Sequence, residues 1–284
     1  MEGFELTGFS IIMPAFHAAA TIAQSVGSVL NGTFADFELL LIADDAADYR
    51  QALADSGISD PRLRYLQSGG VGTGSSHARN VGLDAAQYDF IAILDADDLF
   101  LDDKLQRIAP LVERYGFVST ALDVREAGRG HLRNVGAGED KALTPAAYKF
   151  TNVSMDSMIA YDRRIIDPRY DESQDCLTDL DLILKLFAGF ATCFHSGVPL
   201  HAYVKQSRSI SIGTGASDRY RRMKRTLIER LESGHYPMRD PAGPEGFVRF
   251  LQASLRAEES FERAKLERPG LIFEDHLEPY LSSA

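Results

Sequence analysis

Short apolar runs alternate with segments of helical spacing along the first hundred residues of the chain. The apolar runs are continuous, which is typical of parallel strands that are covered on both faces. The predicted strands are 9–14, 38–43, 62–66 and 90–94, and the predicted helices are 21–30, 49–55 and 77–87. This alternation predicts an α/β fold with a mostly parallel sheet and helices on both of its faces.

The pattern changes after residue 100. A further helix, an extended pair, an apolar helix and a long extended segment precede a polar C-terminal part that predicts two or three helices. In chain order these are 102–115, 117–135 with its turn at Gly128, Arg129 and Gly130, 180–187, 191–204, and the region from 217 onward, interrupted by Pro237, Pro241 and Pro244.

The composition is that of a soluble globular protein. Hydrophobic residues make up 45% of the 284 residues and charged residues 25%, which excludes a disordered or collagen-like chain. No apolar run approaches the roughly 18 residues of a membrane-spanning helix, and the N-terminus lacks the positive charge of a secretory signal. Cys176 and Cys193 lie in apolar surroundings, so we expect free thiols in a reducing, cytoplasmic compartment.

The net charge of −11 is distributed unevenly. Residues 1–204 carry 16 basic and 29 acidic side chains, whereas residues 205–284 carry 14 and 12. The acidic part argues against binding of nucleic acid, because DNA and RNA phosphates must be met by positive charge. An anionic substrate would need a bridging metal ion there.

Polar residues follow three of the predicted strands directly. Pro14 and Phe16 end the first strand, Asp44 and Asp45 follow the second, and an acidic turn starting at Asp95 follows the fourth. Ligands bind at the carboxyl ends of the strands in such sheets. We therefore expect these residues to converge on one edge of the sheet.

Asp95, Asp97 and Asp98 form the acidic turn. Three carboxylates this close repel one another unless a cation neutralises them. Mg²⁺ or Mn²⁺ suits such oxygen ligands and keeps coordination places for substrate phosphates. The alternative is a solvated turn that caps the next helix, since Asp is common in both settings.

Two other chemistries fit the sequence less well. A DxDx[TV] phosphatase motif would need Thr or Val where Leu99 stands, and the loop 69–76 has Ser75 in place of both the P-loop lysine and the last glycine of GxGxxG. A flexible loop is the better interpretation of 69–76. His77 beside it and His195 in a predicted strand are interpreted as structural or surface residues.

Taken in order, six segments resemble the family 2 glycosyltransferases of the GT-A fold. They correspond to the family's opening strand, the strand ending in an Asp pair, the A-R-N-x-G helix, the DxD segment, the E-D-x-D-L helix and the segment that closes the site. In this chain they read SIIMPAF at 10–16, ELLLIADDAAD at 38–48, ARNVG at 78–82, LDADDLF at 94–100, TDLDLILKL at 178–186 and SIS at 209–211.

The resemblance covers about residues 8–212 and implies a domain organisation. Residues 1–212 would form a GT-A domain with a Rossmann-like sheet, in which 1–100 bind the nucleotide and 101–212 the acceptor. Residues 213–284 would form a helical C-terminal extension.

The resemblance also implies roles for individual residues. Asp179 would be the general base, and Asp97 would be the direct ligand of Mn²⁺ or Mg²⁺. The nucleotide would lie at Pro14, Phe16, Asp45, Arg79 and Asp95. Further candidates are Asp98, Asp181, His201 and Gln206, which stands where the family has a late histidine.

The implied activity is inverting transfer of a sugar from a nucleotide-diphospho-sugar, with UDP favoured, to a hydroxyl of a glycan or lipid-linked acceptor. Such an enzyme would act in surface polysaccharide synthesis. A carboxylate base would deprotonate the acceptor, and a divalent metal would stabilise the leaving diphosphate. The alternative is a non-catalytic protein of the same fold that binds nucleotide sugars or glycans.

The segment 217–233 combines an apolar helical face with a cluster of basic residues. One interpretation is a solvated face on a packed helix. The other is a cationic patch that meets an anionic membrane or a lipid-diphosphate acceptor, which would place the protein at the inner membrane face.

Overall fold

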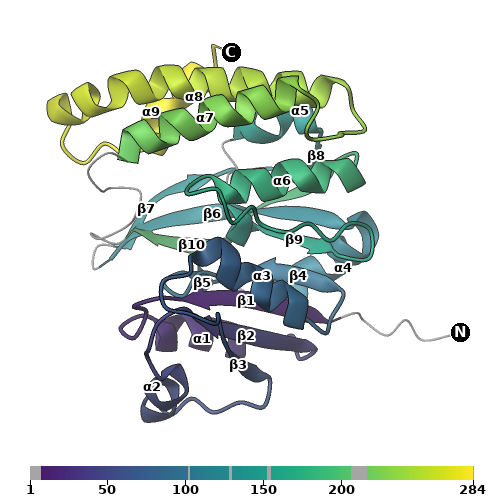
Figure 1. Ribbon diagram of the computed structural model, residues 1–284, viewed down its shortest axis with the longest axis vertical. Coiled ribbons are helices and arrows are strands. Elements are labelled where there is room, and N and C mark those ends of the chain that lie inside the picture. Colours follow the sequence, from purple (N-terminus) through teal and green to yellow (C-terminus); the bar gives the residue numbers. More distant parts are fainter. Residues whose placement is uncertain (1–7, 102, 128–129, 152–154, 206–215, 284) are drawn as a thin grey trace, which may run out of the picture.

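The structure is a computed structural model that describes residues 8–101, 103–127, 130–151, 155–205 and 216–283. Ten strands form one sheet (Figure 1). They are β1 (Phe9–Ala15), β2 (Phe37–Ala43), β3 (Leu63–Gln67), β4 (Phe90–Ile93), β5 (Leu99–Phe100), β6 (Phe117–Glu126), β7 (Gly130–Val135), β8 (Lys141–Leu143), β9 (Ile159–Asp162) and β10 (Cys193–Lys205).

The α-helices of the described part alternate with the first strands and then gather at the C-terminal end. They are α1 (Ile22–Leu30), α2 (Tyr49–Asp55), α3 (Ser75–Ala85), α4 (Lys104–Tyr115), α5 (Pro145–Tyr148), α6 (Thr178–Gly189), α7 (Ala216–Glu232), α8 (Ala242–Glu267) and α9 (Phe273–Leu281). Two short 3-10 turns, η1 (Lys149–Thr151) and η2 (Asp156–Met158), join α5 to β9.

The sheet has the order β3-β2-β1-β4-β9-β6-β10-β5, with β7 on β6 and β8 on β10. The first half is parallel, because β1 pairs in parallel with both β2 and β4, and β2 with β3. In the second half β9 runs antiparallel to β4 and β6, while β10 is parallel to β6. The predicted α/β class is confirmed, and its parallel pairing is concentrated in the first hundred residues.

Strands β1, β2 and β4 are buried on both faces because helices cover both, whereas the edge strand β3 is buried only at Leu63. Along β1, Ile11 and Met13 pack on the side of α1, α2 and α4, whereas Ile12 packs on the side of α3 and α6. Successive side chains of a strand point to opposite faces, so the unbroken apolar run supplies two cores at once. This is the physical reason for the continuous hydrophobic pattern in the sequence.

Helices α7, α8 and α9 lie together at one end of the molecule, beyond α5 and α6 (Figure 1). Helix α8 approaches α5 very closely, because a Cβ at Gly246 would lie 2.3 Å from Cα of Ala146. The side chains of Leu227 and Phe247 are buried in the same core as α6. Pro237 and Pro241 lie between helices, but Pro244 lies in the first turn of α8, where a missing N–H costs nothing.

We predict opposite effects for two glycine substitutions in helices. A Cβ at Gly82 of α3 would lie 2.6 Å from Cγ2 of Ile12 and 2.8 Å from Cδ1 of Ile42, whereas one at Gly27 of α1 meets nothing closer than 4.0 Å. Gly82→Ala should therefore destabilise the protein by about 1–3 kcal/mol through overpacking. Gly27→Ala should leave stability unchanged or raise it by up to about 1 kcal/mol.

Urea unfolding of both variants measures this difference. Equal stability of Gly82→Ala and the wild type would contradict the close packing of α3 on the sheet.

Candidate active site

The carboxyl ends of β1, β2 and β4 lie side by side and place the predicted nucleotide residues on one edge of the sheet. Pro14 still pairs with β2 at Ile42 but lies beyond the last β4 partner of β1, which is where a strand tolerates a residue without N–H. Phe16 is the first residue after β1, and its side chain is 50% exposed. Its ring lies 4.0 Å from the ring of His17, and a Cβ at Gly72 would be 3.9 Å from it.

Asp45 is buried and joins the ends of β1 and β2. Its carboxylate accepts hydrogen bonds from the N–H of His17 at 2.6 Å, from the N–H of Ala47 at 3.1 Å and from the hydroxyl of Tyr49 at 2.9 Å. Burial raises the pKa of Asp45, but these hydrogen bonds outweigh it and the pKa is below its usual value. The group is therefore an ionised acceptor with a fixed orientation.

Asp44, which was not a predicted site residue, organises the glycine-rich loop. Its carboxylate accepts from the hydroxyl of Ser68, from the N–H and hydroxyl of Thr73 and from the N–H of Gly74. Its carbonyl accepts from the N–H of Gly72 at 2.7 Å. The loop predicted to be flexible is thus tied to the end of β2 beside Phe16.

The acidic turn after β4 contains three carboxylates in three different environments. Asp98 is buried and accepts from the N–H of Val204 at 2.9 Å and from Nε2 of His201 at 3.1 Å. His201 is fully buried, and burial together with the charge of Lys104 lowers its pKa well below the usual value. It is therefore neutral, and in the described structure its Nε2 forms a hydrogen bond with the Asp98 carboxyl group.

Asp97 is half-buried, and no side chain in the described residues pairs with it. Burial, followed by the charge of Asp95, raises its pKa to about 6. A cation would relieve both effects.

The carboxylates of the acidic turn fit a Mg²⁺ or Mn²⁺ site in which the substrate supplies most of the metal ligands. Within the described part of the chain no group of three or more His, Cys, Asp or Glu side chains surrounds a metal position. Mg²⁺ is commonly bound by one or two carboxylates plus substrate phosphates, and Asp97 offers such a carboxylate.

Arg79 connects the acidic turn to the second half of the sheet. It is buried on α3, donates from Nη2 to Asp95 at 2.6 Å and places Nε 3.5 Å from Asp156 in η2. The hydroxyl of Tyr170 donates to Asp156 at 2.8 Å. The guanidinium is thus engaged by two carboxylates of the protein, and it offsets their charge.

Asp179 lies in the first turn of α6 and is half-buried. Burial, followed by the charge of Asp156, raises its pKa to about 6, against an opposing effect of Lys149 and Arg79. The Lys149 ammonium is buried beneath α8, and burial lowers its pKa to about 7. A carboxylate with a pKa near the working pH is suited to general base catalysis.

Asp181, two residues further along α6, is fully buried. Residues two apart on a helix point about 200° away from each other, which separates the half-exposed Asp179 from the interior Asp181. Gln206 and the segment 209–211 lie outside the described residues, so their predicted place in the site has no structural counterpart here.

Asp156, Tyr170 and Lys149 were not predicted from the sequence. They lie in short turns and irregular segments between β8 and α6, where neither a strand nor a helix period marks them. No local signal in this polar, irregular stretch of sequence distinguishes them from their neighbours.

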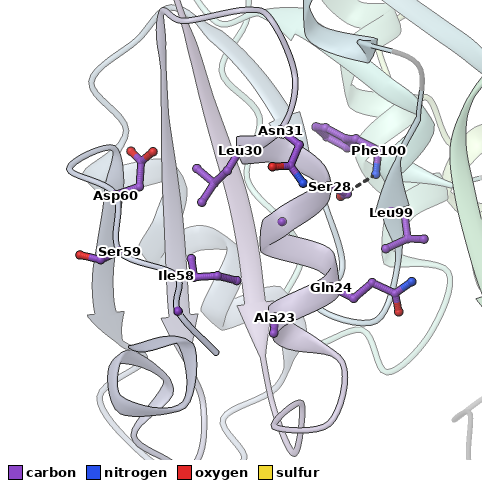
Figure 2. Close-up of a pocket in the computed structure, with 12 residues that line it drawn as sticks. Ala23, Gln24, Ser28, Leu30, Asn31, Ile58, Ser59, Asp60, Leu99 and Phe100 are labelled. Carbon is purple, nitrogen blue, oxygen red and sulfur yellow. Dashed lines mark hydrogen bonds between the residues drawn. The ribbon is translucent and has the colours of Figure 1, made fainter. Parts of the chain in front are cut away.

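A surface hollow of about 600 Å³ lies elsewhere, between α1, the segment after α2 and β5 (Figure 2). In its wall, the hydroxyl oxygen of Ser28 accepts a hydrogen bond from the N–H of Phe100. Asp60 is the one carboxylate among the lining residues. None of the predicted site residues lines it, and those residues lie at the carboxyl edge of the sheet instead.

Comparisons with known proteins identify the family of this chain. The model of glycosyl transferase family 2 matches residues 10–168, which is more than half of the chain. The chain therefore belongs to glycosyl transferase family 2.

Two curated relatives illustrate the similarity. A UDP-Glc:alpha-D-GlcNAc-diphosphoundecaprenol beta-1,3-glucosyltransferase, WfgD of Escherichia coli, is 40% identical over 97 residues, which cover 34% of this chain and 38% of that protein. The succinoglycan biosynthesis protein ExoO of Rhizobium meliloti is 29% identical over 177 residues, which cover 60% of this chain and 50% of ExoO. The matched segments span less than two thirds of either relative.

Among solved structures, S. aureus TarS 1–349 in complex with UDP-GlcNAc superposes with a TM-score of 0.67 at 14% identity, covering 96% of this chain and 79% of that one. At this identity the likeness establishes the GT-A glycosyltransferase fold.

Two residues of the basic cluster of α7 are neutralised by ion pairs within the protein. Arg221 pairs with Asp218, and Lys224 is buried against Glu258 at 2.6 Å. Arg222 and Arg225 are exposed. In the described part of the chain, no helix is both long enough and apolar enough to cross a membrane.

We predict that Arg79→Met destabilises the protein by about 3 kcal/mol, because it leaves Asp95 and the buried Asp156 without their shared cation. Urea unfolding at neutral pH measures the loss. Arg114→Met on the exposed end of α4 is the control and should change stability by less than about 0.5 kcal/mol. A loss no larger than that of the control would show that Arg79 is not the counter-ion of this cluster.

Proposed function

We propose that the protein is an inverting glycosyltransferase that moves a sugar from a nucleotide-diphospho-sugar, with UDP favoured, to a hydroxyl of a glycan or lipid-linked acceptor. Family membership supports the general activity. The names of WfgD and of the TarS complex, which mention UDP-Glc and UDP-GlcNAc, support a UDP-sugar donor. Those names describe the relatives, and we propose a UDP-sugar donor and a hydroxyl acceptor for this chain.

One observation carries the proposal: two half-buried carboxylates with raised pKa lie on either side of one buried ion cluster. Asp97 is next to Asp95, which pairs with Arg79, and Arg79 contacts Asp156, whose charge raises the pKa of Asp179. Two titratable groups held in desolvated positions near one another are typical of an active site.

On the donor side, the exposed Phe16 ring would stack on the base. A base N–H would bind the Asp45 carboxylate, which is 6% exposed and already accepts three hydrogen bonds from the protein. Asp44 holds the glycine-rich loop beside them. Asp97 would bind Mg²⁺ or Mn²⁺, with Asp95 close by and Asp98 supporting the turn. When bound, the metal would supply positive charge against the charge that develops on the leaving diphosphate.

On the acceptor side, Asp179 removes the proton from the attacking hydroxyl as the hydroxyl oxygen bonds to the anomeric carbon. The bond to the diphosphate oxygen breaks on the opposite face, so the configuration at that carbon is inverted. A carboxylate with a pKa of about 6 is ionised at neutral pH and still accepts a proton more readily than an ordinary Asp.

The domain boundaries follow from these roles. Residues 1–100 would bind the nucleotide, 101–212 would complete the acceptor side, and 213–284 would form the helical extension. A place at the inner membrane face in surface polysaccharide synthesis is consistent with the diphosphoundecaprenol acceptor in the name of WfgD and with the exposed Arg222 and Arg225. The buried free thiols Cys176 and Cys193 are consistent with a cytoplasmic location.

We predict that UDP together with Mn²⁺ or Mg²⁺ raises the melting temperature of the wild type, because both ligands bind only the folded state. Asp97→Asn removes one ligand charge and should abolish the metal-dependent part of the shift. Asp36→Asn changes an exposed carboxylate before β2, at the opposite edge of the sheet, and is the control that should keep the full shift. The metal assignment fails if Asp97→Asn keeps the full shift as well.

We predict that Asp179→Asn lowers turnover of a UDP-sugar at least about 100-fold, because the variant cannot accept the proton, while the UDP-dependent thermal shift persists. In the wild type, kcat should be full above pH 7 and fall as the pH drops through about 6, since the base is then protonated. A raised pKa means that the charged form is disfavoured by folding, so Asp179→Asn should not lower stability at neutral pH.

Metal-dependent hydrolysis of UDP-glucose and UDP-N-acetylglucosamine, with further nucleotide sugars in the same screen, measures these rates. Binding of UDP without turnover of any donor would favour the non-catalytic alternative.

A further inference from the structure

The turn that leads into α6 has an unusual backbone. Leu177, the residue before the helix, has φ 56° and ψ 29°, which is the left-handed region that non-glycine residues rarely adopt. No side chain caps the helix in the usual way, although Thr178 stands at its first position. This conformation persists only if surrounding contacts determine it, and it lies two residues before Asp179.

Gln174 supplies those contacts from within the turn. Its side chain is buried, and its Nε2 donates to the carbonyl of Cys176 and to the carbonyl of Leu177, each at 2.9 Å. The carbonyl of Leu177 also accepts the first helical hydrogen bond, from the N–H of Asp181 at 3.1 Å. The amide of Gln174 therefore fixes the carbonyls on which the first turn of α6 is built.

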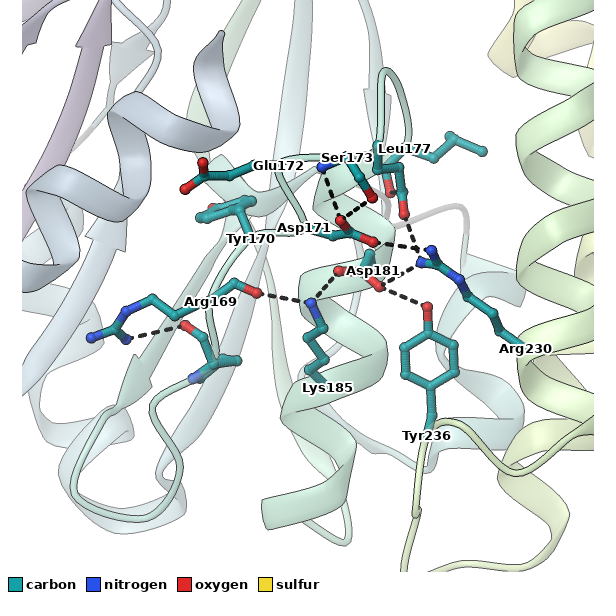
Figure 3. A network of polar contacts seen from close by, with 12 residues as sticks. Arg169, Tyr170, Asp171, Glu172, Ser173, Leu177, Asp181, Lys185, Arg230 and Tyr236 are labelled. Atoms are coloured by element: carbon teal, nitrogen blue, oxygen red, sulfur yellow. Dashed lines mark hydrogen bonds and ion pairs between the residues drawn. The ribbon is translucent and has the colours of Figure 1, made fainter. Parts of the chain in front are cut away.

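Helix α7 in turn holds Gln174. Arg230 donates from Nη1 to Oε1 of Gln174 at 3.1 Å and from Nη2 to Oδ2 of Asp171 at 3.0 Å. Its Nη1 also lies 3.7 Å from Oδ1 of Asp181 (Figure 3). One guanidinium thus contacts the start of the turn, its central glutamine and the helix that follows, as its planar fork of donors permits.

Asp181 anchors the other face of the same helix. It is fully buried, accepts from the hydroxyl of Tyr236 at 2.6 Å and pairs with Lys185 at 2.6 Å. Lys185 also donates to the carbonyl of Arg169 (Figure 3). Because Asp179 and Asp181 point about 200° apart, fixing Asp181 in the interior also fixes the direction of Asp179.

The turn is attached to the nucleotide side as well. The N–H of Tyr170 donates to Asn80 of α3 at 2.9 Å, and Asn80 donates to Glu172 at 2.8 Å. His77 of α3 also contacts Glu172, at 3.0 Å. The segment 170–177 is therefore fixed between α3 on one side and α7 on the other.

We infer that the C-terminal helices position the general base: Arg230 and Tyr236, acting through Gln174 and Asp181, hold the first turn of α6 so that Asp179 faces the acceptor hydroxyl. They are positioning residues, since none of them belongs to the carboxylate cluster that would meet substrate. The inference rests on the proposed role of Asp179. It gives residues 216–236 a part in the reaction in addition to packing.

The test compares Arg230→Met, Arg230→Lys and Tyr236→Phe with two controls in full-length protein. Arg263→Met removes an exposed cation from α8, and Tyr115→Phe removes the hydroxyl of a partly exposed tyrosine of α4. The readouts are kcat and KM for metal-dependent hydrolysis of UDP-glucose and UDP-N-acetylglucosamine, the UDP-dependent thermal shift, and amide hydrogen exchange of peptides spanning 174–185.

We expect Arg230→Met to lower kcat by roughly 10- to 100-fold, since a misplaced catalytic group loses rate without losing binding. KM and the UDP-dependent shift should stay within about twofold of the wild type, and exchange across 174–185 should accelerate. Tyr236→Phe should show the same pattern more weakly. Arg230→Lys should recover part of kcat, because it restores the charge without the fork.

The inference is wrong if Arg230→Met and Tyr236→Phe keep the kcat of the controls, or if kcat, KM and UDP binding all deteriorate together as in general unfolding. The exchange measurement also decides it without turnover, because unchanged exchange across 174–185 in both variants would show that α7 does not hold the turn. Absence of turnover in the wild type would instead count against the proposed function.

Discussion

The pairing of two carboxylates with one buried arginine is the constraint on which the rest of the structure depends. Arg79 reaches from α3 to Asp95 after β4 and to Asp156 in η2. Taking charged groups out of water is costly unless they are paired, so these three elements must dock in one arrangement. That arrangement brings the acidic turn of the first half of the sheet next to the start of α6 in the second half.

The two candidate carboxylates share this surrounding but remain incompletely compensated. Burial raises the pKa of both groups, and a neighbouring carboxylate raises it further, Asp95 for Asp97 and Asp156 for Asp179. For Asp97, the uncompensated negative charge favours binding of a cation, and for Asp179 the raised pKa favours uptake of a proton. The same electrostatic situation therefore suits two different tasks on the two sides of a substrate.

Much of the first half of the fold could be predicted from the sequence, because buried parallel strands produce continuous apolar runs and the polar residues after them share one edge. The strands and helices up to residue 100 agree with the structure to within a few residues. The segment 141–171 could not be predicted in this way. Its short elements α5, η1, η2 and β9 are too brief for a period, and Asp156 gains its role only through contact with Arg79, which is 77 positions away.

The local sequence also gave no indication of what fixes Asp179, because the partners of its turn lie on a helix some 50 residues later. The left-handed backbone of Leu177 and the half-buried carboxylate of Asp179 both lower the stability of the folded state. Packing of Leu227, Phe247 and their neighbours into the core of α6 opposes this cost, since buried apolar area is the main source of stability. The polar contacts of Arg230 with Gln174 and of Tyr236 with Asp181 connect the packed C-terminal helices to the turn and to α6. In this view the C-terminal helices support a strained turn and the desolvated carboxylate of Asp179, the proposed base, through contacts that the sheet does not make.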